Sequence, residues 1–312
     1  MRRLSSEQYE GAREFLKTEA RPLDRALFEH RFEEAPAEHV IVELARYQNE
    51  DGGFGRALEP DVRTPSSSAL ATGIAMTILK ELGCSPQHRM VTGGVQFLCE
   101  TFDEKEGVWR AIPHDANDYP HAPWWHDEDG SLARTFDDFL IIPRAQIVGL
   151  LQHYATPVPT DWLQAVTEDT VTAIETLPDD AFGGGGDTLR YALELAETDA
   201  LSQRFKDRLT PRLRDLGTQV VCRDPQEWSG YCATPLKIAP LPQSILAGTL
   251  RDSLQLQLDY LIDHQTPEGT WKPTWTWGDF YPEVWKQAKR EWRGHVTLET
   301  LTSLDAFGRI QG

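Results

Sequence analysis

Apolar residues recur along most of the chain at every third or fourth position, which is the spacing of one face of an α-helix. Strict alternation of apolar and polar residues is scarce, and no Asn-Gly pair marks a tight hairpin. The pattern therefore predicts an all-α protein. The predicted helices are 5–19, one that begins at Pro22, 37–47, 66–82, 88–102, 136–154, 160–176, 187–197, 201–222, 251–265 and 296–307.

Two kinds of helical segment alternate along the sequence. Segments such as 88–102 and 160–176 are amphipathic, whereas 66–82 and 136–154 are apolar on nearly every side and are expected to be buried. An outer amphipathic helix, a turn and an inner apolar helix follow one another about five or six times. This order predicts an α/α toroid, in which an inner ring of helices lies within an outer ring.

Nothing in the sequence marks a boundary between domains, because the composition does not shift and no linker appears. We therefore predict a single toroid domain over residues 1–312. Two stretches are longer than a turn between helices requires, and we expect them to be loop insertions at about 110–135 and about 271–294. The apolar stretch 233–248 is broken by prolines.

One turn pattern occurs near both ends of the chain. A glutamine lies four residues before a glycine, and an aromatic residue lies two residues after that glycine. The glutamine amide can bond a backbone group left over at a helix end, and glycine permits a positive φ. The aromatic ring can then stack over the turn, so these residues are expected to fasten a helical hairpin. The two copies are Gln48-x3-Gly52-x-Phe54 and Gln265-x3-Gly269-x-Trp271.

Composition excludes some partners. The formal net charge is −18, which argues against a general binder of nucleic acid or of anionic membranes. Hydrophobic residues at 40% and charged residues at 26% are typical of a soluble globular protein. No apolar run reaches transmembrane length, and no signal-peptide core follows Met1. The four cysteines have no Cys-x2-Cys spacing, so we expect free thiols and a cytoplasmic location.

The turn pattern resembles the QW motif of terpenoid cyclases. Residues 260–271 read Tyr260-Leu261-x3-Gln265-x3-Gly269-x-Trp271, and Gly107-x-Trp109 repeats the end of the motif. Two copies depart from the motif, since the copy that ends at Trp109 lacks the glutamine and Phe54 stands in place of a tryptophan. The resemblance implies the α/α toroid of class II terpene cyclases and of protein-prenyltransferase β subunits. The weakest copies keep only Phe182-Gly183 and Trp228.

Class II cyclases protonate an alkene or epoxide with the middle aspartate of a DxDD motif. The nearest match here is Thr135-Phe136-Asp137-Asp138, in which Thr135 replaces the first acid. The resemblance implies Asp137 as the catalytic acid and Asp138 as its partner, because an adjacent carboxylate helps to keep an acid protonated. The alternative is an ordinary acidic helix start that favours the helix dipole.

Prenyltransferases bind zinc through aspartate, cysteine and histidine. Cys232 and His295 occupy comparable places, but Gly230 stands where the aspartate is expected. Two ligands do not complete a tetrahedral site, so a free thiol and a helix-capping histidine are the alternative. We therefore predict no cofactor, with zinc as the weaker possibility. A prenyltransferase β subunit would also need an α partner, and the sequence leaves the oligomeric state open.

The loop before the first inner helix carries Glu59, Asp61 and Arg63. These acids and this arginine would lie at the mouth of the predicted barrel. Glu59 and Asp61 are candidate catalytic acids, and Arg63 is a candidate substrate-binding residue. A loop held by its own salt bridges is the alternative.

The two insertions are rich in aromatic residues. Aromatic faces can stabilise a carbocation or stack on sugar rings, and they can also simply fill gaps over helix ends. Three functions follow: a terpenoid-cyclase-like enzyme acting on a prenyl-type substrate, a carbohydrate-active glycosidase or lyase, and a non-catalytic binding toroid. In each case we expect the small molecule or glycan in a central cavity. The candidate binding residues are Tyr119, His121, Trp124, Trp125, His126, Trp275, Trp277, Tyr281 and Trp285.

Overall fold

The computed structural model describes residues 1–127, 141–156 and 158–311. Helices make up 56% of the structure, which confirms the all-α prediction. No helix in the described part of the chain is long and apolar enough to cross a membrane. The chain divides into two compact units, a terminal unit (1–43, 184–186 and 217–312) and a middle unit (44–183 and 187–216). The single-domain toroid stays a prediction.

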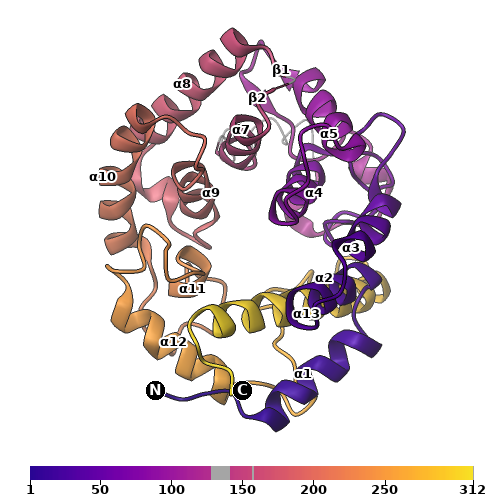
Figure 1. Ribbon diagram of the computed structural model, residues 1–312, viewed down its shortest axis with the longest axis vertical. Helices are drawn as coiled ribbons and strands as arrows, with labels where there is room; N and C mark the ends of the chain where they lie inside the picture. Colours follow the sequence, from indigo (N-terminus) through magenta and orange to yellow (C-terminus); the bar gives the residue numbers. More distant parts are fainter. Residues whose placement is uncertain (128–140, 157, 312) are drawn as a thin grey trace. The chain divides into compact units, whose positions relative to one another are not determined.

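In its described ranges, the middle unit is built on the buried helices α4 (Ala69–Glu81), α7 (Arg144–His153) and α9 (Asp187–Ala196). Helix α7 packs between α4 and α9, while α5 packs on α4 and α8 packs on α7 (Figure 1). Along the chain, the more buried helices α4, α7 and α9 are separated by the less buried helices α5 and α8. The other elements among its described residues are η1 (Ala45–Tyr47), α5 (Arg89–Glu100), β1 (Phe102–Asp103), β2 (Val108–Trp109), η2 (Ala116–Asp118), η3 (Pro123–Trp125), α8 (Thr160–Thr176), η4 (Asp179–Phe182) and most of α10 (Gln203–Val220).

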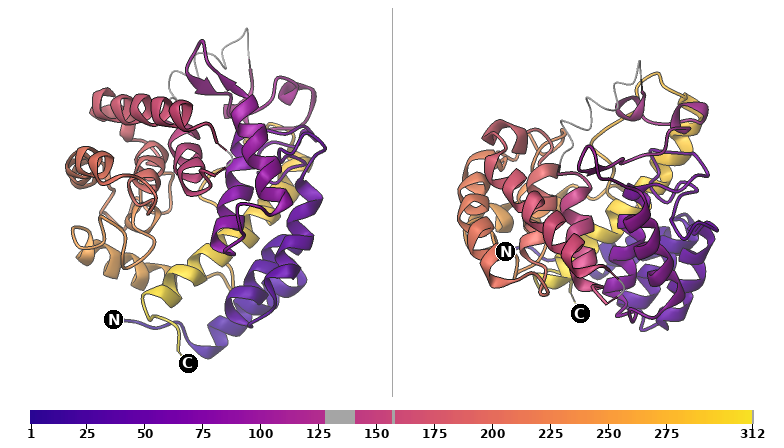
Figure 2. Two further views of the ribbon diagram at one scale, coloured as in Figure 1. Left: turned by 45° about the horizontal axis from the view of Figure 1, so that its top comes forward. Right: turned by 90° about the horizontal axis from the view of Figure 1, so that it is seen from above.

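The terminal unit groups the first helices of the chain with the last. Helices α1 (Ser6–Thr18), α2 (Pro22–Phe32) and α13 (Pro282–Ala306) pack on one another, and Figure 2 shows them from two further sides. The short α11 (Pro235–Ile238) packs on α12 (Arg251–Asp263). Helix α3 (Ala37–Leu44) leads into the middle unit.

Two predicted helix starts are wrong by more than a turn. Residues 141–143 form a turn, so among the described residues the predicted helix 136–154 begins at Arg144. Helix α13 begins at Pro282, so the last part of the predicted insertion 271–294 is helical, and Trp285 and Trp292 lie within the helix. Proline is favoured in the first turn of a helix, so Pro282 is a start signal that the sequence prediction missed. The stretch 233–248 forms only the short α11, because Pro240 and Pro242 follow it closely.

The turn after α12 is fastened as its residues predict. The Gln265 amide donates to the carbonyl oxygens of Gly269 and of Gln8 in α1, both at 2.9 Å. Gly269 has φ +76° and lies against the backbone of Gly11. The Trp271 indole donates to the Leu261 carbonyl at 2.8 Å. The glutamine thus joins this turn to the neighbouring helix α1.

The turn before α4 repeats this arrangement in the middle unit. The Gln48 amide donates to the carbonyl oxygens of Gly52, at 3.0 Å, and of Met90 in α5, at 3.4 Å. Gly52 has φ +85° and lies against the backbone of Gly93. The backbone N–H of Phe54 donates to the Thr72 hydroxyl at 3.0 Å. The matching bond in the terminal unit joins the Trp271 N–H to the Thr297 hydroxyl at 3.2 Å. Each turn therefore connects two helices besides its own.

Candidate active site

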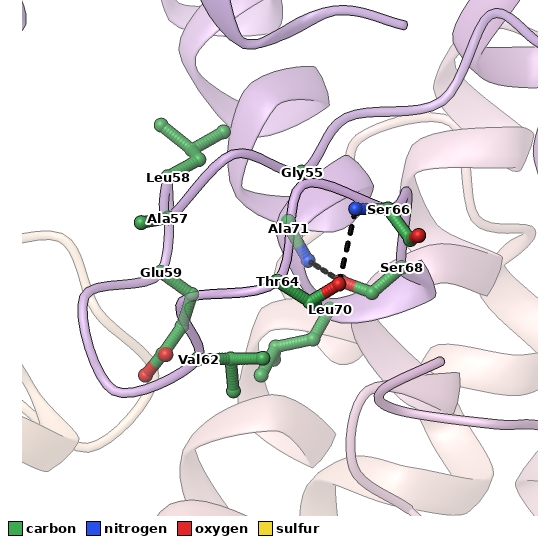
Figure 3. A pocket seen from close by; sticks show the side chains of 10 residues that line it. All are labelled: Gly55, Ala57, Leu58, Glu59, Val62, Thr64, Ser66, Ser68, Leu70 and Ala71. Atoms are coloured by element: carbon green, nitrogen blue, oxygen red, sulfur yellow. Dashed lines mark hydrogen bonds between the residues drawn. The ribbon is translucent and has the colours of Figure 1, made fainter. Parts of the chain in front are cut away.

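The loop between the Gln48 turn and α4 buries two carboxylates. Glu59 is 8% exposed and Asp61 is 3% exposed, and the Val62 N–H donates to the Glu59 carbonyl across the turn between them at 3.2 Å. Glu59 also lines a cavity of about 10 Å³, which is roughly the space that one water molecule needs. Figure 3 shows the Glu59 carboxylate extending away from Thr64 and the neighbouring serines. Two acids are thus held on one tight turn.

This loop is bonded to the first insertion. Val62 forms an isolated antiparallel bridge with His121. The Arg63 N–H donates to the Pro120 carbonyl at 3.0 Å, and the Ala122 N–H donates to the Asp61 carbonyl at 2.8 Å. The structure therefore brings together two groups of predicted site residues, those of the 59–63 loop and those around His121.

Side-chain bonds from Asp115 strengthen this junction. Its carboxylate accepts from the Thr64 hydroxyl at 3.1 Å and from the Ser66 hydroxyl at 2.6 Å. Both hydroxyls lie in the part of the loop that runs from the two acids to α4, so Asp115 fixes the position of that segment. Sequence reasoning did not single out Thr64 or Ser66, because short hydroxyl residues before a helix are equally typical of a cap.

Two histidines of the insertion form a directed pair. His121 is fully buried, and its Nδ1 lies 2.6 Å from the Tyr119 carbonyl oxygen, so that nitrogen carries the proton. Its Nε2 lies 2.9 Å from Nδ1 of His126 and accepts from it when His121 is neutral. Burial lowers the pKa of His121, and the neighbouring His126 lowers it further, which favours that neutral form. The basic nitrogen of the pair is then Nε2 of His126.

Acidification is expected to destabilise the fold through His121. The lowered pKa means that the unfolded chain takes up a proton near pH 6.5 that the folded imidazole resists, so this stability is present above that pH and is lost below it. Urea midpoints at pH 7.5 and 5.5 should therefore differ less in His121→Gln than in the wild type. The exposed His114 of the same insertion provides the control. An equal effect from His114→Gln would contradict this assignment.

The aromatic residues of the first insertion differ in exposure. Trp125 is 6% exposed and packs inside the unit, whereas Trp124 is 40% exposed. Trp124 lies two residues before His126 and presents a ring surface to solvent. Arg63 is half-buried, and its guanidinium donates to the Pro60 carbonyl at 3.4 Å.

The second insertion lies in the terminal unit, where its tryptophans pack on one another. Trp277 stacks on Trp285 with ring centroids 5.4 Å apart, and these side chains are 1% and 9% exposed. Trp275 meets Trp292 edge to face at 4.9 Å. These contacts agree with the gap-filling interpretation for the four tryptophans. Tyr281, at 39% exposed, is more accessible than Trp277 and Trp285.

Two further sets of residues were predicted as catalytic or metal-binding. Asp137 and Asp138 lie outside the described residues. Cys232 lies against the Glu227 carbonyl at 3.6 Å, and His295 pairs with Glu299 at 3.2 Å. Within the described ranges, no group of three or more histidine, cysteine or acidic side chains is arranged to hold a metal ion.

A buried arginine is a feature that sequence reasoning missed. Arg144 opens α7, is 6% exposed, and donates through Nε to the Thr170 hydroxyl of α8 at 2.8 Å. Burial lowers the pKa of its guanidinium. The sequence signal was a single charge at the head of an apolar run. Its hydrogen bond ties a buried helix to the amphipathic helix behind it.

No protein-family model, curated protein or solved structure matches the chain. The resemblance of residues 260–271 to the QW motif therefore stays a prediction.

Proposed function

We propose that the chain is a carbohydrate-active enzyme that works by acid–base catalysis at the Glu59 loop. The observation that carries this proposal is the joining of two buried carboxylates, Glu59 and Asp61, to the His121–His126 pair through backbone hydrogen bonds. Titratable groups gathered in a buried, bonded arrangement are typical of catalytic sites. This chemistry is polar, which suits a hydroxyl-rich substrate better than a hydrocarbon.

Glycoside hydrolysis needs two carboxyl groups. In the proposed reaction, Glu59 donates its proton to the glycosidic oxygen as the bond to the anomeric carbon breaks. Asp61 takes a proton from the water molecule whose oxygen attacks that carbon. The products are two sugars with free hydroxyl groups. Asp61 then releases its proton to solvent and Glu59 takes one up, which restores the starting state.

The first insertion would bind the sugar. The exposed face of Trp124 offers a stacking surface for a pyranose ring. Nε2 of His126, whose tautomer is set by His121, would accept a hydrogen bond from a sugar hydroxyl. The proposal extends to the toroid, because the order of α4, α7 and α9 with α5 and α8 behind them is the order that two concentric rings require.

The proposal is tested by incubating the protein with a panel of neutral and acidic oligosaccharides. New reducing ends, detected by mass spectrometry, would support it. The panel should include both α- and β-linked substrates, because the arrangement of Glu59 and Asp61 on their turn does not indicate which anomeric linkage is cleaved. Absence of both turnover and binding across the panel would overturn it.

A second candidate is protonation-initiated cyclisation of a prenyl-type substrate with Asp137 as the acid. The observation that favours it is that the Gln48 and Gln265 amides each donate to the glycine carbonyl of their own turn. This is the fastening role expected of the glutamine in a QW-type turn. Any prenyl substrate that is converted should no longer be converted by Asp137→Asn, while Glu59→Gln should leave its conversion intact. The opposite pattern would favour the Glu59 site.

A further inference from the structure

A groove in the terminal unit lies outside the proposed catalytic site. Its volume is about 380 Å³, within the range of small-molecule pockets. Helix α1 forms one wall, the ends of α2 and α13 form the other, and the last residues of the described chain close one end. Its lining includes Tyr9, Glu10, Phe32 and Asp305, together with Ser6 and Ile310.

The groove has an aromatic surface. The rings of Tyr9 and Phe32 meet edge to face with centroids 6.3 Å apart, and Phe32 stacks on the buried Phe28 at 5.3 Å. Tyr9 and Phe32 are both half-buried, so part of each ring is presented to the groove. Phe28 fixes the Phe32 ring from behind, which leaves a preformed aromatic surface.

The charge around these rings is negative. Burial raises the pKa of Tyr9, and the nearby carboxylates Glu33, Glu10 and Asp305 raise it further while Arg13 opposes them. Arg13 binds Glu10 at 3.1 Å and Glu33 at 2.6 Å, so these two acids are already paired.

Asp305 is the exception. It lies in the last turn of α13, which contains no basic residue, so its charge adds to the negative end of the helix dipole. Asp305 makes no ion pair with any residue in the described part of the chain. A cation beside Asp305 would relieve this repulsion, whereas an anion would increase it.

We propose that this groove binds an organic cation, an alkylammonium or guanidinium group that contacts Asp305 and lies against the rings of Tyr9 and Phe32. Aromatic faces attract such cations through the ring quadrupole, and a carboxylate adds direct Coulomb attraction. The alkyl part of the ligand would cover the apolar surface beside Ile310.

Calorimetric titration with agmatine, which carries both kinds of cationic group, tests the proposal. We expect saturable binding at one site in 150 mM salt. Asp305→Asn should weaken it at least ~10-fold, and Phe32→Leu, which keeps the apolar volume but removes the ring, about 5-fold. N-butylurea, a neutral probe, should not bind. Circular dichroism would confirm that both variants are folded.

A matched control separates the groove from the general attraction of an acidic protein for cations. Asp252→Asn removes the same charge from an exposed position of the same unit, at the start of α12, and should leave the affinity unchanged. Equal weakening in Asp252→Asn and Asp305→Asn would overturn the proposal, as would agmatine binding that Asp305→Asn does not change or the absence of binding at millimolar concentrations.

Discussion

Replacing Gly269 with alanine is expected to lower the free energy of unfolding by about 3–5 kcal/mol, from the combined cost of an unfavourable φ and of overpacking. Gly269 has φ +76°, and a Cβ there would lie 2.6 Å from the Gly11 carbonyl oxygen and 2.7 Å from the Ala12 nitrogen. Backbone atoms of α1 cannot rotate away as a side chain can, so the helix must shift. That shift would break the bond from Gln265 to Gln8. Urea unfolding followed by circular dichroism measures the loss.

The chain supplies controls for both parts of this effect. Gly83 has φ +67°, but a Cβ there would meet nothing within 4 Å. Gly83→Ala therefore isolates the conformational cost, about 1–2 kcal/mol. Gly52→Ala should behave like Gly269→Ala, because its Cβ would lie 2.6 Å from the Gly93 carbonyl oxygen. Equal losses at Gly83 and Gly269 would show that close helix contact is not what these turns require.

Sequence reasoning predicted the local part of these turns and missed the rest. The interval from Gln265 to Trp271 spans only a few residues, so the sequence alone predicts that the amide, the glycine and the ring fasten the same turn. The second acceptor of Gln265 is the carbonyl of Gln8, 257 positions away, and any residue type offers a carbonyl. Likewise Gly11 has an ordinary helical place in the sequence, and only packing shows that a Cβ there would lie 3.3 Å from the Cα of Gly269.

The candidate site shows the same division. The acids of the 59–63 loop and the histidines near His121 each stood out by residue type. Their union depends on one isolated bridge between Val62 and His121, with no alternating pattern to predict it. The roles assigned to Asp115, Thr64 and Ser66 depend on side-chain bonds between the two segments. Residue chemistry could therefore identify the candidate residues, while only the folded structure shows that the two segments lie together.

Replacing Glu59 with glutamine is expected to lower kcat/KM on a cleaved oligosaccharide by about 10²–10⁴-fold, the usual contribution of a general acid. Glutamine has nearly the same shape but has no acidic proton to give to the leaving oxygen. Substrates with a good leaving group, such as aryl glycosides, need less protonation and should lose less. Steady-state kinetics on both substrate types would measure this difference, which a merely structural role for Glu59 does not produce.

Glu104→Gln is the matched control for this prediction, because it makes the same change at an exposed position of the same unit. Its activity should equal that of the wild type, and both variants should unfold at similar urea concentrations.

If Glu59→Gln keeps activity within about threefold while folded, proton donation by Glu59 contributes less than about 0.7 kcal/mol to the barrier and the acid lies elsewhere. If it loses activity equally on both substrate types, Glu59 acts by holding the loop between Gly55 and Asp61, and the proton must come from another group. Only a selective loss on the poorer leaving group is consistent with the proposed acid, since that step alone depends on the proton which glutamine cannot supply.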